Sequence, residues 1–397
     1  MTKRKKDRKS RSTVSVNGRI DLSRIRWYAQ GEGSDCPIDR LLDAVESTVT
    51  VGLRQLCCRL GIAGRSFERS VGNLKDAAQV VMGEELYRQV VEGEGKAVLA
   101  ASNDDEQLEI DWSAAQCKTT SPDGRQVTRV YSSADGVLVP TTTEQEKQKR
   151  RATTVEARKK MPPEQRRELP RLLAVKSGSD QSYKQVYLTA FYDQGMEHRL
   201  IGLTRKDHRG LGKLLKRDAA RVHLRAAQER PGLVDGAVCL KKHMDGLPLD
   251  HVILDFRHLG EHVNEASRKT LGAGTEAGKQ WSQQVLHTAR HQGYQPFFAE
   301  LVDWRGQQRG KKREAADDLL TYAAKRDDMM PYDTCDQKGW DVGSGPMESM
   351  CGVTTDRIKG RGRRWDIDNA EALMALEALW QSGLWDKYWS NALCHPN

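Results

Sequence analysis

The chain has 397 residues, 30% of them charged, and no apolar run approaches the roughly 20 residues that a membrane-spanning helix needs. We therefore expect a soluble protein of two or three domains that has no membrane partner. Its eight cysteines form no C-x-x-C pair, which argues against a zinc ribbon or a disulfide framework and favours a reducing cytoplasm. The formal net charge of +9 favours a polyanionic partner, most commonly nucleic acid.

Basic residues are concentrated in three runs. Residues 1–36 begin with one of them and lack the apolar stretch of a secretory signal, so we expect a disordered basic arm. The second run, 146–171, is polar and proline-containing and predicts a long surface loop, and the third is 359–365. Each run alone is typical of a solvated face, but three runs favour phosphate contacts. The expected DNA-binding residues are Lys3, Arg4, Lys5, Lys6, Arg150, Arg151, Lys359, Arg361, Arg363 and Arg364.

Residues 37–104 have the apolar periodicity of short helices. Ser66 stands before Phe67 as a candidate N-cap. The short turn "VVMG" between two helical segments is similar to that of a helix-turn-helix, which would make 37–104 a helical DNA-binding domain. An ordinary helical bundle explains the same pattern, so both interpretations stay open.

From residue 105 onward the pattern changes to strands. The expected strands lie at 107–114, 129–141, 184–193, 198–204, 232–240 and 249–259. A helix with one apolar face is predicted at 211–228, before the last two strands, as packing on a sheet requires. Residues 260–335 are mainly helical, and a further helix opens at "GSGPMES". The order predicts an α/β fold with a mixed sheet covered by helices.

Three acidic residues stand in or beside apolar strands or at a helix start: Asp135, Asp235 and Glu348. A carboxylate in such a place is costly without a partner, and magnesium, which takes oxygen ligands, would supply one. Two ions about 3.5 to 4 Å apart can hold the attacking and leaving oxygens of a phosphodiester. Each residue also has a simpler explanation, because Asp-Gly pairs form turns and a Glu in a first helical turn favours the helix dipole.

The stretch before Glu348 is rich in turn formers. Gly343 and Gly345 permit a tight bend, Ser344 can cap, and Pro346 suits a first helical position. We therefore expect Glu348 in the first turn of a helix, directed toward the two aspartates.

Five segments together resemble the ISKra group of bacterial insertion-sequence transposases. They are "ADGVLVP" (134–140), "LVDGA" (233–237), "LDFRHLGEHV" (254–263), "GSGPMES" (343–349) and the stretch 359–389. The resemblance implies a DDE enzyme with an RNase H-like core, here 105–259 and 336–390, interrupted by a helical insertion at 260–335. It also implies that Asp135, Asp235 and Glu348 bind two Mg²⁺ ions, which Mn²⁺ can replace.

Asp255 competes with Asp235 for the second catalytic position. The related Mutator-like transposases carry a Cys-or-Asp, two residues, His motif near the fifth strand, and Asp255 with His258 fits it. The resemblance thus favours Asp235 as catalytic and gives Asp255 and His258 a supporting role. A hydrogen-bonded histidine at a helix start explains His258 equally well.

The function implied by the resemblance is DNA transposition. Phosphodiesters at the transposon ends would be hydrolysed, and the freed 3′-hydroxyl would be transferred into target DNA. The expected partner is double-stranded DNA, bound by a homo-oligomer in the bacterial cytoplasm and associated with the nucleoid. Two alternatives remain: a catalytically inactive, transposase-derived DNA-binding protein, and an RNase H-like nuclease or resolvase that does not join strands.

Overall fold

The computed structural model describes residues 3–31, 33–41, 47–104, 108–168 and 177–394. Contacts divide the chain into two compact units. Unit 1 comprises Met1–Leu108, Leu138–Gln185 and Val353–Asn397, and unit 2 comprises Glu109–Val137 and Val186–Gly352. Within the described ranges, no helix is both long enough and apolar enough to cross a membrane.

Unit 1 opens with a three-stranded antiparallel sheet, so the expectation of a disordered arm over 1–36 is wrong for the described residues. Its strands, in spatial order, are β1 (Arg4–Ser15), β2 (Gly18–Ala29) and β3 (Gly33–Asp35). The turn between the first two is Asn17-Gly18, and Gly18 has a φ of 94°, a conformation that glycine adopts without strain. Asn-Gly is a strong hairpin signal, which outweighs the basic composition.

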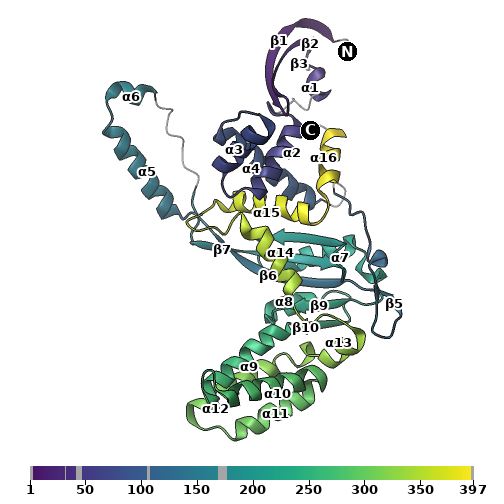
Figure 1. Ribbon diagram of the computed structural model, residues 1–397. Coiled ribbons are helices and arrows are strands. Elements are labelled where there is room, and N and C mark those ends of the chain that lie inside the picture. Colours follow the sequence, from purple (N-terminus) through teal and green to yellow (C-terminus); the bar gives the residue numbers. More distant parts are fainter. Residues whose placement is uncertain (1–2, 32, 42–46, 105–107, 169–176, 395–397) are drawn as a thin grey trace. The chain divides into compact units, whose positions relative to one another are not determined.

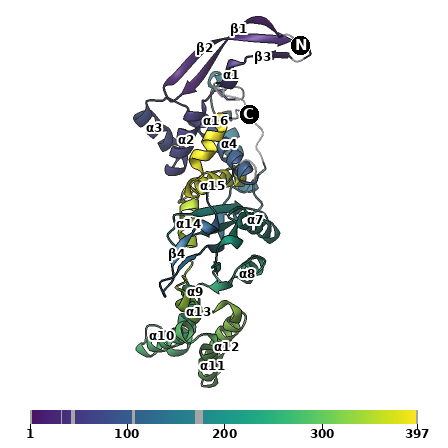
Figure 2. The same cartoon turned by 90° about the vertical axis from the view of Figure 1, so that its right-hand side faces the viewer.

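Besides this sheet, unit 1 contains helices from both ends of the chain (Figure 2). They are α1 (Ile38–Leu41), α2 (Val51–Ala63), α3 (Phe67–Ala78), α4 (Glu84–Ser102), α15 (Ile367–Gln381) and α16 (Trp385–Cys394). The predicted N-cap is confirmed, because the Ser66 hydroxyl accepts a hydrogen bond from the Arg69 amide at 3.1 Å. Helices α4 and α15 cross at Gly95, where a Cβ atom would lie 2.4 Å from the Ala372 carbonyl oxygen.

The basic run expected to be a loop over 146–171 is instead largely helical. Helix α5 spans Glu144–Lys159 and α6 spans Pro163–Glu168, while 169–171 lies outside the described residues. The cause is local: Thr143 and Glu146 form a reciprocal capping box, and the residues that follow are mostly good helix formers. Helix α5 buries none of its residues, so it is a solvated helix.

A five-stranded mixed sheet has the order β10-β9-β6-β7-β8 (Figure 1). Its strands are β6 (Tyr131–Pro140), β7 (Tyr183–Tyr192), β8 (Arg199–Thr204), β9 (Pro231–Val234) and β10 (His251–Leu254). Strands β6, β9 and β10 are parallel neighbours, whereas β7 and β8 form the expected antiparallel pair. The α/β class and the mixed sheet are therefore confirmed.

Three predicted strands differ from the structure. The one expected at 249–259 ends at Leu254, because α9 (Phe256–Leu271) begins there. The described part of the first, 108–114, contains no strand, and the small hairpin of β4 (Lys118–Thr120) and β5 (Gln126–Thr128) follows it. The strand expected at 232–240 ends at Val234, and α8 (Val238–Met244) begins soon afterwards. Gly236, with a φ of 87°, allows the chain to turn there.

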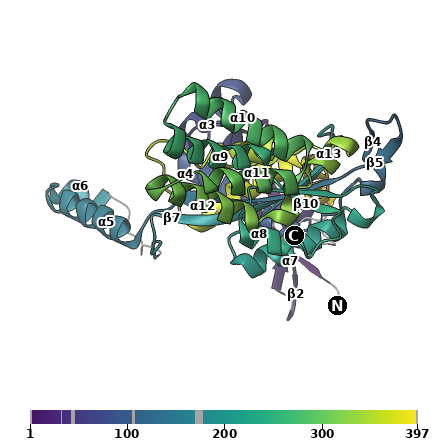
Figure 3. The ribbon, with the colours of Figure 1, turned by 90° about the horizontal axis from the view of Figure 1, so that it is seen from below.

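The remaining helices of unit 2 pack on the sheet or on one another. Helix α7 (His208–Arg221) packs on β8 with Leu211 and Leu215 buried. The others are α9 (Phe256–Leu271), α10 (Glu276–His291), α11 (Tyr294–Gly306), α12 (Gly310–Ala324), α13 (Tyr332–Lys338) and α14 (Gly345–Asp356). Short 3-10 helices span Ala114–Gln116, Leu224–Ala226 and Asp327–Met329. Helices α9 to α12 lie side by side, as Figure 3 shows from below.

Candidate active site

Three aspartates stand in one row across the parallel half of the sheet. In the β6–β9 register Ser133 pairs with Leu233, and in the β9–β10 register Val234 pairs with Leu254. The same registers, continued past the last paired residues, bring Asp135 beside Asp235 and Asp235 beside Asp255. Asp235 and Asp255 directly follow the carboxyl ends of the short buried strands β9 and β10. The carboxyl ends of parallel strands meet at one edge of the sheet, where ligands commonly bind.

Asp135 and Asp235 form an acidic pair, and no lysine or arginine among the described residues makes a salt bridge with either carboxylate. Each carboxylate accepts a hydrogen bond from a nearby backbone amide: Asp135 from Gly136 at 2.6 Å and Asp235 from Ala237 at 2.9 Å. Burial raises the pKa of the Asp135 carboxyl, and the negative charge of Asp235 raises it further. A cation between the two carboxylates would offset both the burial of Asp135 and its repulsion by Asp235.

Asp255 differs from this pair because both oxygens of its carboxylate accept two hydrogen bonds each. Its exposure is 1%. As the N-cap of α9, it accepts hydrogen bonds from the amides of Arg257 at 2.6 Å and His258 at 3.1 Å. Its second oxygen accepts from both the amide and the hydroxyl of Ser344. Burial works to raise the pKa of Asp255, but these hydrogen bonds outweigh it and leave the pKa below its ordinary value.

The Ser344 contacts fasten the start of α14 to the sheet edge. Ser344, expected to cap the helix, instead donates its hydroxyl to Asp255, and its carbonyl accepts the amide of Glu348 at 2.9 Å. Helix α14 begins at Gly345, which places Glu348 in its first turn, as predicted. Asp255 thus fixes the position of Glu348 through Ser344.

The described ion-pair partner of the Glu348 carboxylate is Arg257. The Arg257 guanidinium donates to Glu348 at 3.1 Å, and both side chains are accessible, with exposed fractions of 70% and 40%. Cys351 lies one turn further along α14, on the same face of the helix, and its side chain hydrogen-bonds to Asp135. The helix face that carries Glu348 therefore adjoins Asp135.

The donor chemistry fits a divalent cation, although Glu348 contacts Arg257. Among the residues that the structure describes, no three His, Cys, Asp or Glu side chains gather tightly enough to hold one ion. The Asp135 and Asp235 carboxylates are the oxygen ligands that magnesium prefers. Glu348 would join them only on leaving Arg257.

His258 lies at the first turn of α9 and is partly exposed. Its Nδ1 lies 3.4 Å from Glu261, and its charge lowers the pKa of Asp135 against the effect of burial. The side chain is therefore close enough to Asp135 to influence it electrostatically, beyond the backbone contact that His258 makes with Asp255.

The predicted DNA-binding residues all belong to unit 1, whereas the acidic site belongs to unit 2. Lys3 pairs with Asp35 at 3.2 Å, and Lys6 lies over the Tyr28 ring. The residues predicted in β1 or beside it are Lys3, Arg4, Lys5 and Lys6; those in α5 are Arg150 and Arg151; those before α15 are Lys359, Arg361, Arg363 and Arg364.

Neither Arg257 nor Cys351 was predicted to be part of the site. Arg257 lies in the quoted motif "DFRH", and Cys351 follows Glu348 at helical spacing. Helical spacing from an expected catalytic residue is the signal that identifies Cys351, whereas the partner of Arg257 lies 91 residues away in the chain.

No protein-family model and no curated protein matches the chain. Among solved structures it is similar to a chain of the Drosophila P element transposase strand transfer complex. The identity is 12%, the match covers 87% of this chain and 81% of that one, and the TM-score is 0.27. A TM-score of this size is too low to indicate a shared fold.

Proposed function

We propose that the protein is a DNA transposase that cleaves phosphodiesters at transposon ends and joins the freed 3′-hydroxyl to target DNA. The observation that carries this proposal is the acidic pair of Asp135, in β6, and Asp235, directly after the neighbouring parallel strand β9, with the start of α14 fastened beside them. A half-buried acidic pair is unfavourable on its own, so its retention favours a cationic ligand.

The strand order supports an RNase H-like core. The resemblance to ISKra-group transposases implies a catalytic Asp in the first core strand and another after the fourth. In the five-stranded sheet, β6 is first along the chain and contains Asp135, and β9 is fourth and is directly followed by Asp235. The final acid, Glu348, is on a late helix, as the resemblance also implies.

The residues of the chain would act as ligands and as positioning groups. When bound, two magnesium ions would lower the pKa of the attacking water and stabilise the leaving 3′ oxygen. Asp135, Asp235 and Glu348 would hold them, with Glu348 turning away from Arg257. Asp255 would keep α14 in place, and Arg257, once released, would present a free guanidinium to a phosphate.

The test is a nicking and strand-transfer assay on duplex DNA that carries the element's ends, with Mg²⁺, Mn²⁺ or EDTA. We expect Asp135→Asn and Glu348→Gln to reduce nicking at least about 100-fold, because even partners outside a metal's ligand shell cost about 10–100-fold. The matched control is Asp303→Asn, an exposed carboxylate on α11 of the same unit, which should nick normally.

Each outcome distinguishes one class of protein. Nicking without joined products would indicate a nuclease or resolvase. Binding of DNA ends without nicking in either metal would indicate a catalytically inactive DNA-binding protein. Full activity of Asp135→Asn would exclude the proposed site.

A further inference from the structure

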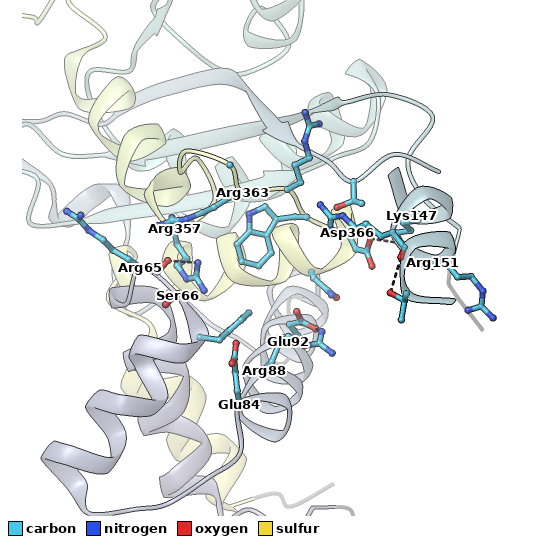
Figure 4. Close-up of a pocket in the computed structure, with 18 residues that line it drawn as sticks. Arg65, Ser66, Glu84, Arg88, Glu92, Lys147, Arg151, Arg357, Arg363 and Asp366 are labelled. Atoms are coloured by element: carbon cyan, nitrogen blue, oxygen red, sulfur yellow. Dashed lines mark hydrogen bonds and ion pairs between the residues drawn. The ribbon is translucent and has the colours of Figure 1, made fainter. Parts of the chain in front are cut away.

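Unit 1 contains a pocket of about 800 Å³ that is rich in positive charge (Figure 4). Among the described residues that line it, eight are arginine or lysine and three are carboxylates. The lining comes from three distant segments of the chain, which lie within 65–92, 142–154 and 357–369. Four of the predicted DNA-binding residues are among them: Arg150, Arg151, Arg363 and Arg364.

The carboxylates of the pocket neutralise only some of its cations, and Arg364 pairs with Glu146, which does not line the pocket, at 3.1 Å. Asp366 pairs with Lys147 at 2.6 Å, and Glu92 pairs with Arg88 at 2.7 Å. Within the described part of the chain, the guanidinium groups of Arg65 and Arg150 have no carboxylate partner. The pocket therefore retains an excess of positive charge that is available to an anion.

Arg357 is a buried cation in the wall of this pocket. Its exposure is 7%, and it donates to the carbonyl oxygens of Gly61 at 3.2 Å and Arg65 at 3.1 Å. Its guanidinium lies over the rings of Phe67 and Trp365, with its carbon 4.8 and 5.1 Å from their centroids. No described carboxylate pairs with it, although a buried charge normally has a counter-ion.

The surroundings of Arg357 disfavour its charged form. Burial, and then the positive charge of Arg363, lower the pKa of Arg357 to about 10. An anion bound beside Arg357 and Arg363 would offset both effects by its attraction to the two guanidinium groups.

Helix ends add to the positive potential. Ser66, the N-cap of α3, Glu84, the first residue of α4, and Asp366, the N-cap of α15, all line the pocket. Each helix start carries a partial positive charge from its unpaired amides. Glu84 and Asp366 bring carboxylates to two of these starts, so the helix ends add less to the anion site than the buried Arg357 does.

We propose that this pocket binds the phosphodiester backbone of unpaired nucleotides in a DNA strand. The volume lies in the range of about 300–1,000 Å³ found for small-ligand sites, whereas a duplex, whose major groove alone is about 12 Å wide, cannot enter. Arginine forks bind phosphate oxygens, and the partly exposed Trp365 offers an aromatic surface to a base. The choice of DNA over another polyphosphate rests on the proposed function; the anion site itself does not.

The test is fluorescence anisotropy of a labelled single-stranded oligonucleotide, titrated with the full chain at several salt concentrations. The variant is Arg65→Gln with Arg150→Gln, two exposed residues without carboxylate partners, so its fold should be unaffected. The matched control is Arg69→Gln with Lys149→Gln, which removes the same charge from α3 and α5 outside the pocket.

We expect the pocket variant to raise the Kd about tenfold or more, since two charge-assisted contacts to phosphate oxygens are lost. The slope of log K against log salt should fall by about 1.4, because each lost phosphate contact removes about 0.7. The control should bind nearly as tightly as the wild type. Asp135→Asn should also bind normally, so loss of nicking and loss of strand binding would be separate failures.

Three results would overturn the inference. They are equal binding by the pocket variant and the wild type, an equal loss in the Arg69→Gln, Lys149→Gln control, and competition by blunt duplex as strong as competition by single strand. Full competition by a mononucleotide at the same concentration of phosphate would assign the pocket to a small ligand instead.

Discussion

The contact between Asp255 and Ser344 gives the sharpest prediction about unit 2. Ser344→Ala removes one of four hydrogen bonds to a carboxylate that is 1% exposed and leaves the other three. Because the acceptor is charged and buried, we expect the free energy of unfolding to fall by about 1.5–3 kcal/mol. A neutral contact should cost less: Ser267→Ala, which removes a buried hydroxyl bonded to the Gly278 carbonyl at 2.9 Å, should cost about 1 kcal/mol.

The assay is urea denaturation of the wild type, Ser344→Ala, Asp255→Asn and the double variant, with Ser267→Ala as control. Asp255→Asn directs an amide at the Ser344 N–H and should cost about 3 kcal/mol. The double variant should cost less than the sum of the singles, since both disturb one contact. A Ser344→Ala variant as stable as Ser267→Ala, or strict additivity, would refute the role assigned to Asp255.

Three further changes test other parts of the structure. Arg257→Gln should free Glu348 and tighten Mn²⁺ binding several-fold in a titration of the protein alone; unchanged affinity would show that the ion pair does not restrain the site. The stability advantage of wild type over Asp255→Asn should be present above about pH 4 and be lost as pH falls through the lowered pKa of Asp255, which thermal denaturation across pH would detect. Gly95→Ala should destabilise unit 1 despite a gain of about 1 kcal/mol in helix propensity, because the new Cβ meets the Ala372 carbonyl, and a raised melting temperature would contradict this.

Local sequence signals explain where the fold was predictable. The strands of the central sheet were recognised because their buried residues are apolar and short turns bound them. The N-terminal hairpin was missed although Asn17-Gly18 marks it, and α5 was missed although Thr143 and Glu146 form a capping box. In both segments the basic composition suggested an unstructured surface, but turn and cap chemistry decide local structure more directly than charge does.

The candidate site was only partly accessible to such reasoning. Asp135 and Asp235 could be identified because each interrupts or follows an apolar strand, and a parallel sheet brings such positions to one edge. The hydrogen bonds from Ser344 to Asp255 could not be predicted in this way. Ser344 is 89 residues away, and no local pattern specifies which carboxylate its hydroxyl contacts. Whether a carboxylate serves as a cap or as a metal ligand depends on the donors around it, and those come from distant elements.

The basic pocket extends this argument to charge. A reading of runs along the chain selects Arg363 and Arg364 as members of a basic cluster and passes over Arg357, which stands just before it. Yet Arg357 is the cation that is most costly to leave unpaired, because Phe67, 290 positions earlier, and the Arg65 carbonyl enclose it. Solvent screens the charge of an exposed cation, whereas a buried cation is stabilised mainly by a nearby anion. Burial therefore identifies the anion site more sharply than the number of basic residues does.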